Sequence, residues 1–178
     1  PSQLDDTNRD CTNDELCFLL DLGKKETKNC QVQLFTEGEQ AQYPARTFAE
    51  LCLPSKNKKL AKNKQDIYLR SISFDKKTKD VYHYVHSHGV CFESEFVAMR
   101  VYFDQRQTID LYGKINKGLV IYDTQFYPSA EQLQAGSGDD CLWVGNTYGL
   151  GALRGWDGKD QLHLTDVKYQ EQRVISEG

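Results

Sequence analysis

The densest group of side chains able to do chemistry in this 178-residue sequence is formed by His83, His86 and His88, with Glu93 five residues further on. On a β-strand His86 and His88 project to one face, because successive side chains alternate, and His83 projects to the other. Two imidazoles and a carboxylate are ligands that Zn²⁺ accepts. Imidazole also titrates near neutral pH. The pattern therefore allows a metal site or a pH sensor, and equally histidines at a strand end.

The same residues are similar to the first metal-binding motif of the cupins. The glycines that flank that motif are missing, and the only later histidine, His163, stands in WDGKDQLHLTD without the expected surroundings. We therefore expect no metal site and no bound cofactor.

The sequence supports nucleophilic or glycosidic catalysis even less than it supports a metal site. Cys91 is close to the histidines in sequence, but there is no GxSxG elbow and no papain-like cysteine signature. A glycosidase needs two carboxylates facing each other across a cleft, whereas Glu93 and Glu95 share one strand face at most. The sequence predicts a protein that is not an enzyme.

A glycine-rich stretch, 145–158, lacks the Lys-Ser/Thr ending of a phosphate-binding loop. Tyr148 and Trp156 lie in predicted loops, where flat aromatic rings stack on sugars or anchor a protein partner. Trp143 alternates with Leu142 and Val144, which predicts a strand with Trp143 in the core. Tyr148 and Trp156 are thus the candidate partner or glycan surface, and loop packing is the alternative.

The six cysteines indicate disulfide bonds, with reduced thiols in the core as the alternative. Their number is even and no CxxC pair occurs, which fits neither zinc nor a thioredoxin-like site. Six cysteines allow 15 pairings, and the sequence does not choose among them. Three disulfides require an oxidising compartment, so we expect a secreted protein in its mature form, because PSQLDDTNRD has no signal-peptide character. The residues concerned are Cys11, Cys17, Cys30, Cys52, Cys91 and Cys141.

The amino-acid composition argues against a disordered chain, a membrane-inserted protein and a nucleic-acid-binding protein. Aromatic residues make up 11% of the chain, too many for a disordered solvating segment, and no apolar run is long enough for membrane insertion. The net charge of −4 lacks the basic clusters of nucleic-acid-binding proteins. Five lysines in 54–65 predict a solvated loop, with an anionic partner as the alternative.

Local sequence patterns predict that the first third of the chain contains both helices and strands. Thr12 and Glu15 form a capping box before leucines at helical spacing, which predicts a helix over 13–22. Residues 30–36 alternate as a strand does. Thr47 and Glu50 form a second capping box, which predicts a short helix ending before Pro54.

From Asp66 onward the hydrophobic period is two. This period predicts strands near 66–74, 80–86, 95–104, 107–112, 117–123, 141–147 and 161–169. The capping pair Ser129 and Gln132 predicts one helix among them, at 130–135. Connections this short predict antiparallel pairing. The expected fold is mainly β: a disulfide-stapled α+β domain over 1–78, followed by an antiparallel β-sandwich over 79–178. One continuous domain is the alternative.

This layout of a capped helix, early cysteines and a late β-sandwich resembles the dual-domain secreted-in-xylem effectors of Fusarium wilt fungi. The resemblance implies release from a precursor by a kexin-like protease and a virulence or avirulence role in a host plant. It implies a host plant protein as partner, with recognition by a plant immune receptor, and action in the apoplast or xylem or inside host cells. We expect a monomeric secreted effector that works by binding. The alternative is a secreted carbohydrate-binding module that uses Tyr148 and Trp156.

Overall fold

The computed structural model describes residues 2–39, 42–54, 64–75, 81–104, 107–124, 127–143, 150–162 and 167–176. Its contacts divide the chain into two compact units, Pro1–Ala45 and Arg46–Gly178. Each unit is described by itself. No helix in the described part of the chain is long and apolar enough to cross a membrane.

The first unit is built on one antiparallel hairpin, β1 (Ser2–Asp5) and β2 (Glu15–Phe18), with Ser2 opposite Phe18 and Asp5 opposite Glu15. The hairpin closes through a hydrogen bond from the Asp14 backbone N–H to the Asp5 carbonyl, at 2.9 Å. In the connecting loop the Asp14 carboxylate accepts hydrogen bonds from the backbone and hydroxyl of Thr7.

The predicted helix over 13–22 is therefore wrong. Asp14 and the residues before it bind back onto the loop, so the chain enters a strand at Glu15 instead of a helical turn. The strand predicted at 30–36 does not form either.

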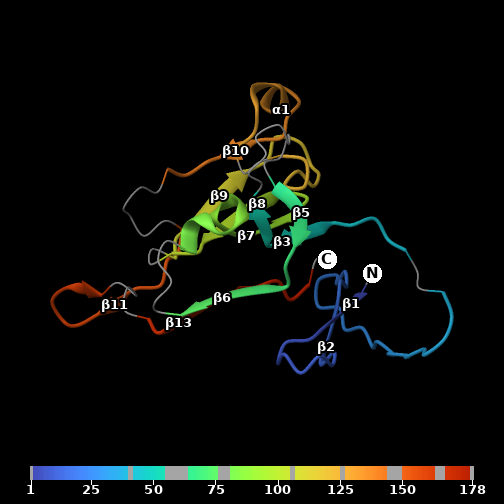
Figure 1. Ribbon diagram of the computed structural model, residues 1–178. Helices are drawn as coiled ribbons and strands as arrows, with labels where there is room; N and C mark the ends of the chain where they lie inside the picture. Colours follow the sequence, from blue (N-terminus) through green and yellow to red (C-terminus); the bar gives the residue numbers. More distant parts are fainter. Residues whose placement is uncertain are drawn as a thin grey trace. The chain divides into compact units, whose positions relative to one another are not determined.

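The second unit contains a five-stranded antiparallel sheet in the order β10-β9-β8-β7-β3 (Figure 1). The sheet is a meander from β7 to β9, with β3 and β10 added at its edges. Its strands are β3 (Thr47–Glu50), β7 (Gly89–Ser94), β8 (Val97–Tyr102), β9 (Ile109–Gly113) and β10 (Asp139–Asp140).

Three two-stranded ribbons accompany the sheet. Their strands are β4 (Cys52–Pro54) with β5 (Lys64–Tyr68), β6 (Ser71–Asp75) with β13 (Tyr169–Arg173), and β11 (Gly155–Trp156) with β12 (Gln161–Leu162). The β6–β13 ribbon contributes to an apolar core around Leu51, Val85, Phe103 and Val174. Gln172 of β13 ties it to the sheet by bonding the Val90 N–H and the Val101 carbonyl, at 2.9 and 3.0 Å.

Three short helices are described. Helix α1 (Ala130–Gln134) begins at the predicted capping box, because the Ser129 hydroxyl accepts from the Gln132 N–H and the Gln132 side chain accepts from the Ser129 N–H. The 3₁₀ helices η1 (Val81–His83) and η2 (His86–His88) occupy the place of the strand predicted at 80–86.

The prediction of a mainly β, antiparallel fold is confirmed. Strands β8 and β9 lie where alternation placed them, and the helix at 130–135 is present. The short helix predicted from Thr47 is wrong, because Thr47–Glu50 is strand β3, paired with β7. Strand β3 pairs with β7 and strand β6 pairs with β13, so the division at residue 45 differs from the predicted domains 1–78 and 79–178.

Gly138, just before β10, and Gly158 both have a positive φ angle, but only Gly138 is closely packed against another segment. Substituting each glycine therefore tests the packing around β10. Gly138 has φ +89°, and a Cβ there would overlap the carbonyl oxygen of Gly113; Gly158 has φ +103° and open space around it. We expect Gly158→Ala to lower the free energy of unfolding by about 1–2 kcal/mol, the cost of a left-handed residue. Gly138→Ala adds a backbone collision and should cost clearly more. Chemical denaturation of both variants measures this difference, and equal losses would contradict the packing.

Candidate functional site

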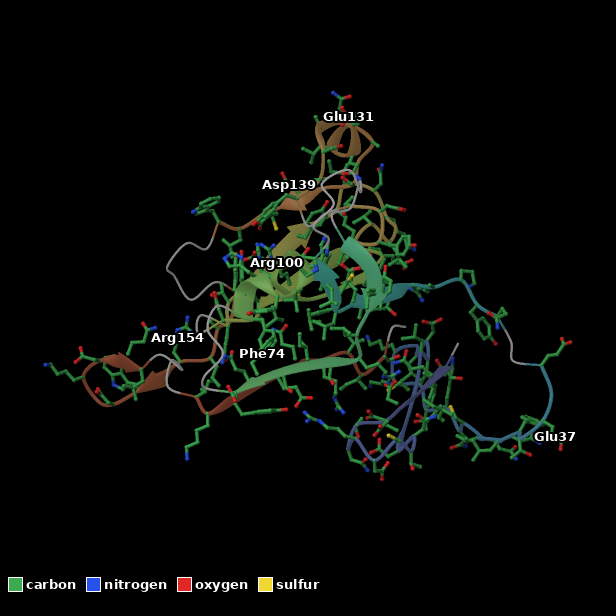
Figure 2. The ribbon with its side chains drawn as sticks, viewed as in Figure 1. Glu37, Phe74, Arg100, Glu131, Asp139 and Arg154 are labelled. Carbon is green, nitrogen blue, oxygen red and sulfur yellow. The ribbon has the colours of Figure 1, made fainter. Side chains whose placement is uncertain are left out.

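One face of the five-stranded sheet carries a row of charged side chains. The register places Glu50 opposite Cys91, Cys91 opposite Arg100 and Arg100 opposite Asp110, so the row crosses four strands. Glu50, Arg100 and Asp110 are each 1–2% exposed. Figure 2 labels Arg100 among the side chains packed on the sheet. Burial of this kind requires each charge to find a partner.

Arg100 lies at the centre of the row. Its Nε donates to Asp110 Oδ2 at 3.2 Å, and its Nη2 donates to the same oxygen and to the hydroxyls of Tyr102 and Tyr127, at 2.7 and 2.8 Å. Both tyrosine rings lie within cation–π distance of the guanidinium carbon, at 4.6 and 5.1 Å. Desolvation lowers the pKa of Arg100, but the hydrogen bond to Asp110 and the surrounding oxygens outweigh it, so the pKa is held above its ordinary value.

A second buried ion pair, Glu93 with Lys114, holds the segment that follows β9 in place. Lys114 Nζ bonds the Glu93 carboxylate and also donates to the carbonyls of Ser94 and Gly118, both at 2.6 Å. The remaining lone pairs of Glu93 accept from the backbone N–H groups of Val120 and Ile121, at 2.8–3.0 Å. These bonds explain why the predicted strand at 117–123 is absent: its amides bind a carboxylate instead of a neighbouring strand.

His86, His88 and Glu93, which were considered as metal ligands and rejected, do not come together in the structure. The His86 Nδ1 lies 3.1 Å from Glu50 Oε1, and both side chains are at most 5% exposed. The His88 ring stacks on Tyr82, with ring centroids 3.7 Å apart, and its Nδ1 lies 3.0 Å from the Tyr82 carbonyl. Glu93 is engaged with Lys114. The three side chains thus have separate partners, and His163 lies outside the described residues.

The charges of this face are therefore paired with one another, although the second carboxylate oxygen of Asp110, Oδ1, is buried without a hydrogen-bond partner. This pairing holds the strands in register and keeps the loop around Val120 in place. Arg100 and Asp110 were missed by sequence reasoning, although their signal is visible afterwards: each is a single charge in the middle of an alternating strand, at facing positions.

Both tryptophans, which lie in the last third of the chain, are exposed. Trp143 is 92% exposed and Trp156 is 67% exposed, so the prediction that Trp143 lies in the core is wrong. Trp156 sits on the β11–β12 hairpin, whose turn is closed by the Asp157 carboxylate, which accepts from the N–H groups of Lys159 and Asp160 at 2.8 and 2.7 Å. Tyr148, the other residue of the candidate surface, lies outside the described residues.

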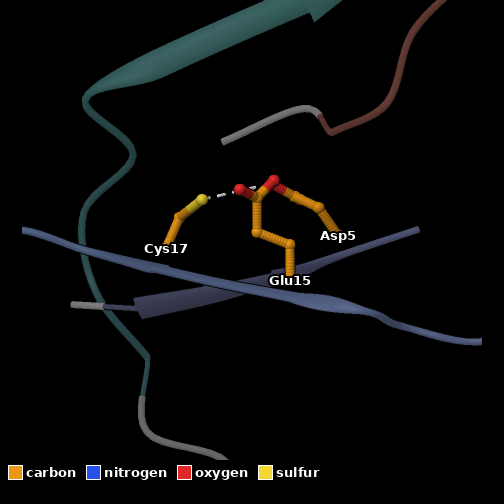
Figure 3. Close-up of side chains that lie close together, drawn as sticks. All are labelled: Asp5, Glu15 and Cys17. Atoms are coloured by element: carbon orange, nitrogen blue, oxygen red, sulfur yellow. Dashed lines mark hydrogen bonds between the residues drawn. The ribbon is translucent and has the colours of Figure 1, made fainter. Parts of the chain in front are cut away.

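A third group of side chains converges in the first unit. Asp5, Glu15 and Cys17 bring one ligand atom each to within 4.8 Å of one another (Figure 3). Burial, the hydrogen bond to Asp5 and the charges of Glu15 and Asp5 raise the pKa of the Cys17 thiol. The group was missed because a helix was expected here, and only the strand register brings these residues together.

The structure joins no two of its cysteines in a disulfide bond. All six, Cys11, Cys17, Cys30, Cys52, Cys91 and Cys141, stand as thiols. Of these, Cys52 and Cys91 are buried, and Cys11, Cys30 and Cys141 are exposed. The three predicted disulfides therefore stay a prediction.

Fold and site together define an antiparallel β protein with a charge-paired sheet face. The whole chain, residues 1–178, matches the model of the family described as "Domain of unknown function (DUF4861)", and the chain belongs to that family. No curated protein and no solved structure matches it.

Removal of one partner from the central ion pair should be costly. Asp110→Asn leaves the Arg100 guanidinium buried without its counter-charge, which typically costs about 3–5 kcal/mol of unfolding free energy. Glu95→Gln is the matched control, because Glu95 pairs with the exposed ends of Arg46 and Lys117, and it should change stability by a small fraction of that. Urea denaturation of both variants measures the two losses of unfolding free energy. Comparable losses would show that the Arg100–Asp110 pair contributes no more to stability than a surface pair does.

The stacked histidine should make stability depend on pH. Desolvation lowers the pKa of His88 below 6.5; the nearby charges of Arg100, His83 and His86 lower it further, against the hydrogen bond to the Tyr82 carbonyl. A depressed pKa contributes stability above the unfolded value that is lost as the pH falls. Between about pH 8 and about pH 5, His88→Phe should lose less stability than the parent chain. A parent-like pH profile for His88→Phe would refute this assignment.

Proposed function

We propose that this chain is a secreted binding protein of the effector type, and that the aromatic side chain of Trp156 anchors a host plant protein. The observation that carries the proposal is the 67% exposure of a tryptophan on a hairpin whose turn is held by its own hydrogen bonds. Tryptophan, with tyrosine and arginine, is enriched among the residues that dominate the binding energy of protein interfaces. The resemblance to secreted-in-xylem effectors supports the choice of a plant partner.

The hairpin presents Trp156 with little loss of conformational freedom on binding. Trp156 pairs with Gln161 across the ribbon, and the Asp157 backbone N–H adds a bond to the Asp160 carbonyl at 3.2 Å. Leu153 and Leu162, at 66% and 46% exposure, add apolar surface in the same segment. An anchor that is ordered before binding avoids part of the entropy cost of association.

The expected energy follows from area. A tryptophan side chain buries about 150–250 Å², so covering the exposed two-thirds of Trp156 stabilises a complex by about 3 kcal/mol at about 25 cal/mol per Å². That amount corresponds to roughly a hundredfold in affinity.

The chain offers a selective way to test this proposal. It contains two tryptophans, so Trp143→Phe leaves Trp156 as the only indole reporter. A photo-crosslinking residue at position 153, where the native Leu153 is 66% exposed, keeps Trp156 and would capture the partner from the extracellular fluid of plant tissue, with the same residue in the Trp156→Ala protein as control. Lys159, whose side chain is 89% exposed in the same turn, provides the control substitution for the titrations.

The captured protein is then purified and titrated against the variants. We expect Trp156→Ala to weaken binding at least tenfold and Lys159→Ala to leave the Kd within about twofold, with a change in Trp156 fluorescence on binding. Equal affinity of the Trp156→Ala and parent proteins would overturn the proposal.

A carbohydrate-binding module remains the second candidate, because an exposed flat ring also stacks on sugars. Titration of the Trp143→Phe protein with plant and fungal oligosaccharides separates the two. Saturable quenching of Trp156 fluorescence by a glycan favours the module, and no response across the panel removes it.

A further inference from the structure

The β1–β2 hairpin brings three side chains with metal-binding atoms to one place. Asp5 and Glu15 face each other across the two strands, and Cys17 follows Glu15 by two residues, on the same face of β2. Figure 3 shows the carboxylates of Asp5 and Glu15 and the thiol of Cys17 pointing toward one another. The backbone pairing of the hairpin therefore fixes where these groups lie, independently of contacts among the side chains.

The spacing suits a tetrahedral ion. Zn–S bonds of about 2.3 Å and Zn–O bonds of about 2.0 Å place sulfur and oxygen ligands about 3.5 Å apart. The Cys17 sulfur lies 3.6 Å from Asp5 Oδ2, and all three ligand atoms lie within 4.8 Å of one another. Small side-chain rotations would complete a three-ligand set with one position left for water.

Among the residues that the structure describes, this group has no positive partner. Asp5 is 6% exposed, and its carboxylate accepts bonds from the Gln3 amide and the Cys17 thiol, with the second carboxylate, Glu15, facing it. In the described part of the chain no Lys or Arg forms an ion pair with Asp5 or Glu15. Two carboxylates held together with one of them buried repel each other, and a cation removes that repulsion.

The unit also needs a cross-link to be stable. Asp5 is its only buried residue among residues 2–39 and 42–45, while Leu34 and Phe35 are 78% and 75% exposed. An isolated two-stranded hairpin is marginally stable in water, and units of this size without a core usually depend on disulfides, metals or association. Binding of a metal by residues from both strands contributes directly to folding.

We propose that Asp5, Glu15 and Cys17 form a binding site for a divalent transition-metal ion of the zinc class, which joins β1 to β2. A thiolate ligand favours Zn²⁺ over Mg²⁺ or Ca²⁺, which prefer oxygen-only sites. The ion stabilises the first unit, and this role is independent of the partner surface at Trp156. A disulfide that uses Cys17 is the competing arrangement, because one sulfur cannot serve both.

Co²⁺ is the probe, because a thiolate bound to it gives a charge-transfer absorption band that carboxylates alone do not. The full chain, reduced and freed of metal with a chelator, should bind one Co²⁺ with this band, and Zn²⁺ should displace the Co²⁺. Cys17→Ser should abolish the band. Glu15→Gln should weaken Co²⁺ binding at least tenfold, whereas Cys11→Ser, at an exposed cysteine of the same unit, should behave as the parent does.

Hydrogen exchange of the β1–β2 amides gives a second readout that does not depend on absorption. Zn²⁺ should slow exchange at the amides of β1 and β2 in the parent and in Cys11→Ser, and not in Cys17→Ser. The proposal is overturned if the parent shows no thiolate band, if Cys17→Ser keeps it, or if protein purified without reductant carries Cys17 in a disulfide.

Discussion

The burial of charge on one face of the five-stranded sheet is the constraint on which the second unit depends. Arg100, Asp110, Glu50 and Glu93 are nearly inaccessible to water, so each must be neutralised by a neighbour on an adjacent strand or loop. These pairings succeed in one strand register, because a shift of one residue would move every charge to the opposite face. The order β10-β9-β8-β7-β3 and the charge pairs therefore require each other.

The same constraint explains the shape of the connections. Glu93 needs more hydrogen bonds than Lys114 supplies, and it obtains them from the amides of Val120 and Ile121, which would otherwise extend a strand. Glu50 holds the His86 ring, and so the chain turns through two short 3₁₀ helices before β7 begins at Gly89. The hydrophobic pattern predicts strands at 80–86 and 117–123. In the structure, the Glu50 carboxylate bonds His86, at the end of the first segment, and the Glu93 carboxylate bonds the second.

Sequence patterns predicted those elements whose causes are local. The helix from Ala130 follows from the Ser129–Gln132 capping box, and β8 and β9 follow from their short runs of apolar and aromatic residues bounded by turn residues. Thr12 with Glu15 and Thr47 with Glu50 are equally good capping boxes, yet both segments are strands, because pairing with β1 and β7 overrides the local preference. The Arg100–Asp110 pair and the Asp5, Glu15 and Cys17 group could not be predicted, since both depend on which strands become neighbours.

The second unit combines a sheet whose charges are paired with one another and a segment, 150–162, in which we propose that Trp156 is the recognition residue. Hydrogen–deuterium exchange of the second unit, measured with and without the purified partner, tests that proposal most directly. We expect new protection in 150–162, around Trp156, and unchanged exchange in β7, β8 and β9. Protection concentrated around Arg100 and Tyr127, with none in the hairpin, would contradict it.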